Sequence, residues 1–132
     1  MQLGSTHTHR CAPNTGVDRN TRARVTRPVE SEKTLEARLR REVNDRGGMA
    51  IKLLSQLHRG LPDRLVLMPG EHVYFVETKS TGEKPTRLQK HCHNQLRKLG
   101  FDVWVIDNTE SLDRFLSWLD DDRMYDDMAY TR

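Results

Sequence analysis

The sequence predicts an α/β fold in which a mixed central sheet is flanked by helices. Apolar residues recur four positions apart at Leu35, Leu39 and Val43, as on the buried face of a helix. Three short apolar runs follow, and a fourth, residues 101–106, comes after a second helical segment. Strands joined by a turn pair antiparallel and strands joined through a helix pair parallel, so the sheet is expected to be mixed.

The first half of this fold is expected to be one helix and three strands. The helix covers about residues 32–46, because Gly47 and Gly48 end the apolar periodicity. The turn sequence Pro-Gly-Glu at 69–71 separates the last two strands and predicts a hairpin. The expected strands cover residues 49–54, 64–68 and 73–79.

The second half is expected to be a helix, a strand and a helix. A break at residues 82–85 precedes a helix over 86–99, which Gly100 ends. The strand covers 101–106, and Asn108 caps a last helix over 109–119.

Two polar segments flank the single expected domain, residues 30–119. Residues 1–29 hold five arginines and one aspartate, a net charge of +4 in a chain whose total is +3. With few large apolar residues, they are expected to form a flexible basic arm, for which phosphate is a natural partner. Residues 120–132 contain five aspartates and are expected to form a solvated acidic tail.

The sequence shows no sign of a membrane or secreted protein. No apolar run approaches the roughly 20 residues that cross a bilayer, and the polar N-terminus lacks the apolar core of a signal peptide. The two cysteines, Cys11 and Cys92, form no disulfide framework. We therefore expect a cytoplasmic protein, in the host-cell cytoplasm if a virus encodes it.

Charged residues gather where two of the expected strands meet. Glu77 and Lys79 point to the same face of the third strand. A hairpin folded around residue 70 places Asp63 opposite them. An ordinary charged edge strand is the alternative, but the apolar run before Glu77 indicates a strand buried on both sides.

Two carboxylates and an ammonium suit the hydrolysis of a phosphodiester. Asp63 and Glu77 can hold a hard cation such as Mg²⁺, which lowers the pKa of a bound water and draws charge from a phosphate oxygen. Lys79 can orient the attacking water and stabilise charge on the phosphate. The backbone carbonyl of Thr78 can complete the ligand set.

The ordered series of motifs resembles the VRR-NUC family of the PD-(D/E)XK nuclease superfamily. The resemblance covers about residues 31–119 and implies a restriction-endonuclease-like core, with no counterpart for residues 1–29. The matching features are Glu36 in the first helix, the Gly-x-Pro-Asp-Arg segment at 60–64, Glu77 and Lys79 of the Glu-x-Lys strand, and Gln89 in the next helix.

The resemblance implies that Asp63 and Glu77 bind Mg²⁺ or Mn²⁺, with the Thr78 carbonyl as a third protein ligand. It implies that Lys79 is the catalytic lysine. Glu36 and Gln89 complete the implied catalytic set.

For these last two residues the sequence leaves simpler interpretations open. Glu36, an acidic residue of the implied pocket, can equally be a surface carboxylate of its helix. Gln89, an active-site helix residue by the resemblance, also fits a capping box with Thr86, in which it only satisfies the backbone.

Basic residues near these positions are candidate DNA contacts. The helix over 86–99 carries several that can follow a phosphate backbone, although a solvated helix face explains any one of them equally well. His91-Cys92-His93 suggests zinc, but no second cluster has ligand spacing. The candidate DNA-binding residues are Lys52, Arg59, Arg64, Lys84, Arg87 and Lys90.

We therefore expect a metal-dependent, structure-selective DNA endonuclease. A chain of 132 residues has little surface for reading bases, which favours recognition of DNA shape. A homodimer that resolves four-way (Holliday) junctions is the favoured candidate. The alternatives are a flap- or nick-directed nuclease, a restriction-type nuclease, and a non-catalytic nucleic-acid-binding module of the same fold.

Overall fold

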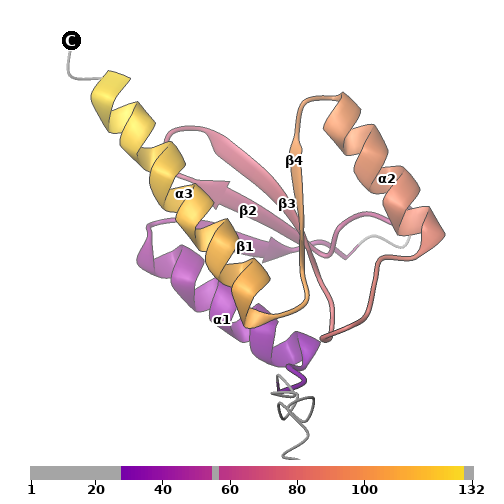
Figure 1. Cartoon of the computed structure of the whole chain (residues 1–132). Helices are drawn as coiled ribbons and strands as arrows, with labels where there is room; N and C mark the ends of the chain where they lie inside the picture. Colours follow the sequence, from indigo (N-terminus) through magenta and orange to yellow (C-terminus); the bar gives the residue numbers. More distant parts are fainter. Residues whose placement is uncertain (1–27, 55–56, 130–132) are drawn as a thin grey trace, which may run out of the picture.

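The computed structural model describes residues 28–54 and 57–129, so nearly all of the expected basic arm lies outside the described residues (Figure 1). The order of elements is helix, three strands, helix, strand and helix, which confirms the predicted α/β class. The helices are α1 (Glu32–Asp45), α2 (Arg87–Lys98) and α3 (Thr109–Ala129). The strands are β1 (Met49–Lys52), β2 (Arg64–Met68), β3 (His72–Thr78) and β4 (Asp102–Ile106).

The four strands form one mixed sheet in the order β1-β2-β3-β4. The first three are antiparallel neighbours, and β3 pairs parallel with β4, as its connection through α2 requires. Arg64 pairs with Val76, so Asp63 comes opposite Glu77, which confirms the predicted hairpin register. The start of β2 and the end of β3 therefore lie at the same end of the sheet.

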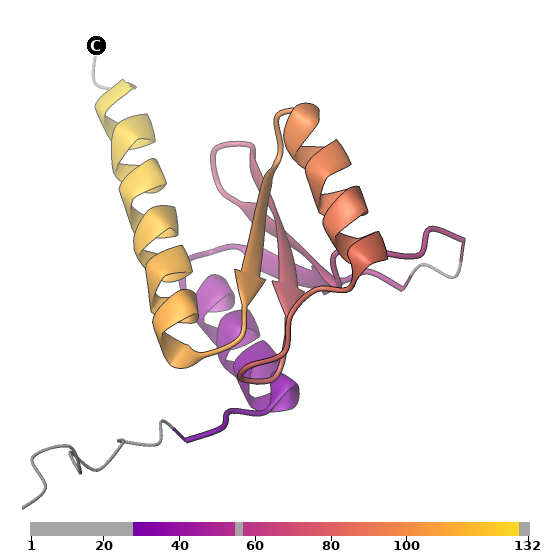
Figure 2. The same ribbon diagram turned by 45° about the vertical axis from the view of Figure 1, so that its right-hand side comes forward.

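Helices α1 and α3 cover one face of the sheet, and α2 lies on the opposite face (Figures 1 and 2). The main core fills the space between α1, α3 and the sheet. The apolar residues of α1 that recur every four positions are all buried there, as the sequence predicts. Tyr74 of β3 meets Phe115 of α3 edge to face, with ring centroids 5.8 Å apart. Each such buried side chain stabilises the fold by about 1.5–3 kcal/mol, so the packing of α1 and α3 against the sheet holds the sheet end in place.

The last helix is longer than predicted, because α3 runs to Ala129 instead of ending near residue 119. Aspartate is a modest helix former, which hid this extension in the sequence. Tertiary contacts hold it instead: Arg46 Nε donates to Asp120 Oδ1 at 2.8 Å, and the Tyr74 hydroxyl donates to Asp122. No helix within residues 28–54 and 57–129 is long and apolar enough to cross a membrane.

Part of the sheet face on the α2 side is left open. Helix α2 packs against β4, at one edge of the sheet. At the other edge, Met49 and Ile51 of β1 are 59% and 37% exposed. Their cross-strand partners Leu67 and Leu65 share this face and are only half-buried. We call Met49, Ile51, Leu65 and Leu67 the open sheet face.

Candidate active site

Asp63 lies directly before β2, at the end of the sheet where β3 finishes. Its Oδ1 accepts a hydrogen bond from the backbone amide of Thr78 at 2.9 Å, and its Oδ2 accepts one from the Thr78 hydroxyl. Side chains alternate across β3, so Thr78 lies on the same face as the core residue Val76. Asp63 is thereby held on the side of the sheet that faces α1.

Glu36 of α1 reaches the same place from the helix. Its Oε1 accepts from the Thr78 hydroxyl at 3.3 Å, and its Oε2 pairs with Arg64 Nη2 at 2.9 Å. The Glu36 side chain is only 15% exposed, and that of Arg64 only 10%. The structure thus brings Glu36 and Asp63 together around Thr78.

The two carboxyl groups respond differently to this environment. Burial acts to raise the pKa of Glu36, but the hydrogen bond and charge of Arg64, a hydrogen bond with Asp63 and the charge of Lys52 together lower it below its usual value. Burial raises the pKa of Asp63, against its hydrogen bonds from Thr78, and the neighbouring Glu36 raises it further.

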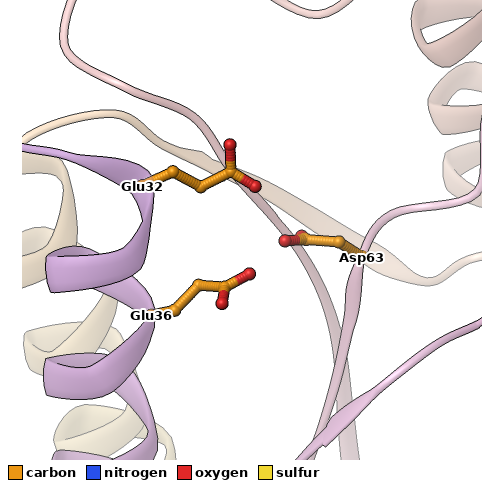
Figure 3. Close-up of side chains that lie close together, drawn as sticks. All are labelled: Glu32, Glu36 and Asp63. Atoms are coloured by element: carbon orange, nitrogen blue, oxygen red, sulfur yellow. The ribbon is translucent and has the colours of Figure 1, made fainter.

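Glu32 adds a third carboxylate that the sequence analysis did not identify. It lies one turn before Glu36 on α1, and both side chains extend toward Asp63 (Figure 3). Single carboxylate oxygens of the three residues lie within 4.8 Å of one another. The spacing of four between Glu32 and Glu36, which places them on one helix face, was the available signal.

Glu77 faces the opposite side of the sheet end, toward α2. Its Oε1 accepts from Gln89 Nε2 at 2.9 Å and lies 3.3 Å from Lys79 Nζ. Its Oε2 has no hydrogen-bond partner among the described residues, and His93 Nε2 is 3.8 Å away. Glu77 is 3% exposed, so an ionisable group with one unsatisfied oxygen is held out of water.

This setting changes the charge of Glu77. Burial raises the pKa of Glu77 to about 7, the negative charge of Asp63 adds to the rise, and Lys79 opposes it. The carboxyl is therefore about half ionised near neutral pH. The structure does not place Glu77 on the same side of the sheet as Asp63, and the carboxylate oxygens that lie within 4.8 Å of one another belong to Glu32, Glu36 and Asp63.

His93 is a second residue whose place beside Glu77 sequence reasoning missed, since it was considered only as part of a zinc pattern. It is 2% exposed, and its Nε2 has no hydrogen-bond partner within the part of the chain described. Burial, together with the positive charges of Arg97 and Lys79, lowers the pKa of His93, so it is neutral at physiological pH. Its spacing of four from Gln89 was the signal, because both residues then face the sheet from one side of α2.

Gln89 combines the two interpretations that the sequence left open. Its Oε1 accepts a hydrogen bond from the backbone N–H of Thr86 at 2.8 Å. In return the Thr86 hydroxyl accepts one from the backbone N–H of Gln89, which completes a capping box. Because the side-chain oxygen of Gln89 is used in the cap, its side-chain nitrogen Nε2 is directed to Glu77. The start of α2 therefore fixes the position of the Glu77 carboxylate.

The candidate DNA-binding residues divide into two groups. Lys84, Arg87 and Lys90 are exposed on α2 and the segment before it, and Arg59 is exposed before Asp63. Lys52 is also exposed and is close enough to Glu36 to affect its pKa.

Arg64 differs from the others because it is buried and paired with Glu36, which turns it away from an approaching phosphate backbone. The alternation of β2 explains this, since Arg64 shares the inward face with Val66 and Met68.

Replacing Arg64 by methionine is expected to destabilise the protein by about 2–4 kcal/mol at pH 7, because Glu36 and Asp63 would lose the buried cation that balances them. Urea unfolding of Arg64→Met measures the loss. The double variant Arg64→Met/Glu36→Gln should recover much of it. A single variant as stable as the wild type would contradict the importance of the pair.

Two comparisons relate the chain to known proteins, while no family model matches it. A phage protein named "Putative nuclease p44", from Acyrthosiphon pisum secondary endosymbiont phage 1, is 44% identical over 79 residues, which are 60% of this chain and 85% of that protein. A solved structure described as a VRR_NUC domain is 27% identical, with a TM-score of 0.63 over 67% of this chain and 97% of that one. Each of the two similarities therefore covers most of the length of the protein compared with this chain.

Proposed function

The chain belongs to the VRR-NUC family, and from this premise we propose that it is a metal-dependent DNA endonuclease that hydrolyses phosphodiester bonds. One observation carries the proposal. Asp63 with Glu36 on one side, and Glu77 with Lys79 on the other, meet at a single end of the sheet. A non-catalytic module would have no need to keep three carboxylates and a lysine wholly or partly buried together, since burying charge is costly.

The residues at this end fit a hard divalent cation. Carboxylate oxygens of Glu32, Glu36 and Asp63 lie within 4.8 Å of one another, and Glu77 Oε2 is buried without a hydrogen-bond partner among the described residues. Such oxygen donors favour Mg²⁺ or Mn²⁺. Asp63 and Glu77 would hold the ion from the two sides of the sheet end, with Glu36 and the Thr78 carbonyl beside them. When bound, such an ion lowers the pKa of a coordinated water and offsets charge on the phosphate.

The protein's own groups have separate parts in the reaction. Lys79 Nζ, 3.3 Å from Glu77, is placed to orient the attacking water and to stabilise negative charge as the phosphorus becomes pentavalent. Gln89 keeps the Glu77 carboxylate aligned through its hydrogen bond of 2.9 Å. Arg87 and Lys90, exposed on α2, would hold the phosphate backbone of the substrate.

We further infer that two copies act together on branched DNA, with the four-way junction as the preferred substrate. The open sheet face supports association, because exposed apolar residues gathered on one surface mark an interaction site. A symmetric dimer would present two catalytic centres to the two strands that a junction resolvase must cut. Light scattering on the purified protein tests the dimer, and a monomer at micromolar concentration would contradict it.

Cleavage of end-labelled four-way junction, flap, nicked and linear duplex DNA tests the proposed activity. We expect cutting with Mg²⁺ or Mn²⁺, none with EDTA, and none by Asp63→Ala, which lacks a carboxylate at the centre of the site. Thermal unfolding of Asp63→Ala should match or exceed that of the wild type, because a buried carboxylate beside Glu36 is removed. Retained cutting by this variant would refute the assigned site.

The other outcomes of the same experiment are informative. Binding of DNA without cleavage under every metal would indicate a non-catalytic module. Preference for the flap or nicked DNA over the four-way junction would replace the resolvase by a flap- or nick-directed enzyme. Cutting of linear duplex at defined sequences would favour a restriction-type nuclease.

A further inference from the structure

A groove runs along α2, outside the carboxylate site. Its volume is about 660 Å³, and it lies between α2 and the residues that precede Asp63. Four leucines form its apolar part and several basic residues line it as well. The leucines are Leu61, Leu88, Leu96 and Leu99, and the basic residues include Arg59 and Lys98.

The groove opens next to the candidate active site. Leu61 is two residues before Asp63, and Leu88 directly precedes Gln89. Gly60 brings the two walls together: it has φ +91°, and a Cβ added to it would lie 2.8 Å from the Leu88 carbonyl oxygen. Only glycine combines this backbone conformation with so close an approach. The groove and the carboxylates are thus built on the same two segments.

The leucines and basic residues of the groove together indicate which kind of molecule it binds. Unpaired nucleotides offer both base faces and phosphates, and proteins bind them in basic grooves in which planar side chains stack on the bases. In this groove the leucines and the imidazoles of His58 and His91 are lining side chains that can contact the base faces. Paired DNA hides its base faces inside the stack and presents phosphate and sugar, so it has no use for exposed leucines. From Leu88 to Leu99 the helix rises about 16 Å, which is long enough for more than one nucleotide.

Charge argues against the chain's own N-terminal arm as the occupant. Residues 1–29 carry a net charge of +4, the same sign as Arg59 and Lys98. A polyanion is complementary to these side chains, and a polycation is repelled.

We propose that this groove binds an unpaired stretch of the DNA strand that adjoins the scissile phosphate. The proposal rests on the proposed nuclease function and specifies its substrate class: DNA whose strands separate next to the cut, as at a branch point or a flap. The groove then contributes to the choice of DNA structure, while the carboxylate site does the hydrolysis.

Cys92 allows a direct test, because it lines the groove and the chain has only one other cysteine, Cys11. The full-length protein with Cys11→Ser and Lys79→Ala is incubated with branched DNA that carries a thiol tether on one base, scanned along the strand. We expect disulfide trapping at unpaired positions beside the branch, about tenfold above the same positions in paired DNA. Cys92→Ser should abolish trapping. Equal trapping on paired and unpaired positions, or none at either, would overturn the proposal.

Binding measurements provide an independent test. Fluorescence anisotropy compares Lys98→Glu with Arg41→Glu, an exposed control on α1, in the Lys79→Ala background. On DNA with a splayed, unpaired arm, Lys98→Glu should raise the Kd about tenfold more than the control does. On paired duplex of equal length the two variants should behave alike. Thermal unfolding of both variants checks that each is folded.

The outcomes separate this proposal from the proposed function. If the parent protein binds no DNA of any form, the nuclease function itself fails. If it binds DNA but Lys98→Glu weakens paired and unpaired substrates equally, only the groove proposal fails. If Lys98→Glu changes the oligomeric state measured by light scattering and leaves DNA affinity unaltered, the groove holds a second copy of the chain and the proposal is wrong.

Discussion

Glu77→Gln is expected to abolish cleavage and, in the absence of metal, to make the protein more stable at pH 8. Under the proposed function, cleavage is lost because an amide cannot replace an ionised metal ligand. Stability rises because the folded protein keeps this carboxyl in a buried site that disfavours its charge. Burial raises the pKa of Glu77 to about 7 from an ordinary value of 4.5.

The pH dependence of this gain follows from the direction of the shift. Below pH 4.5 the folded and the unfolded chain both hold the proton, so Glu77 has no effect on stability. Between pH 4.5 and about 7 the unfolded chain releases the proton first, so stability falls as the pH rises. Above pH 7 the full cost remains, about 3 kcal/mol for a shift of this size.

Urea unfolding of wild type and Glu77→Gln in EDTA, at pH 5 and pH 8, measures the effect. We expect a gain of about 2–3 kcal/mol at pH 8 that shrinks to under about 1 kcal/mol at pH 5. Glu83→Gln, in the exposed segment before α2, is the control and should change stability little at either pH. A Glu77→Gln protein less stable than the wild type at pH 8 would show that its ion pair with Lys79 outweighs the burial of the carboxylate.

Lys79→Met is expected to reduce the cleavage rate by about 10²–10³-fold while metal binding is retained. In the proposed function the lysine acts on the attacking water and on the phosphate charge, and the removal of one such group costs about this much in other active sites. Single-turnover cleavage gives the rate, and calorimetric titration with Mn²⁺ gives the metal affinity. Arg41→Met on α1 is the matched control, since Arg41 is exposed and contributes nothing to the site.

Two results would change the role assigned to Lys79. Loss of Mn²⁺ binding together with activity would indicate that the lysine organises the site, because it stabilises the ionised Glu77. An unchanged rate would leave the water without a group to orient it and would point to Lys52, near Glu36, as the working cation.

The position of Asp63 relative to Glu77 was predictable from the sequence of the hairpin. The turn at 69–71 fixes the register of the hairpin, and the register places Asp63 opposite Glu77. The apolar stripe of α1 predicted which face of the helix is buried, but only the family resemblance marked the neighbouring Glu36 as a site residue, since the sequence does not show where along the sheet α1 packs. In the structure, the burial of Leu35 and Leu39 places Glu36 beside Asp63.

The remaining features depend on contacts between distant segments. His93 was considered only as part of a zinc pattern, and its burial against Glu77 arises from the docking of α2 on the sheet. The extension of α3 depends on Arg46 and Tyr74, which lie far from it in sequence. For Arg64 the information was present, because a residue two before Val66 on a half-buried strand faces inward.

The capping box of α2 has a consequence for how the site is lost. Gln89 closes the first turn of the helix with one end of its amide and holds Glu77 with the other. Opening of that turn therefore breaks the hydrogen bond between Gln89 and Glu77 in the same event, so the alignment of the carboxylate depends on a closed helix start. Hydrogen exchange of the Gln89 backbone amide, which donates to Thr86 Oγ1, reports how often this turn opens.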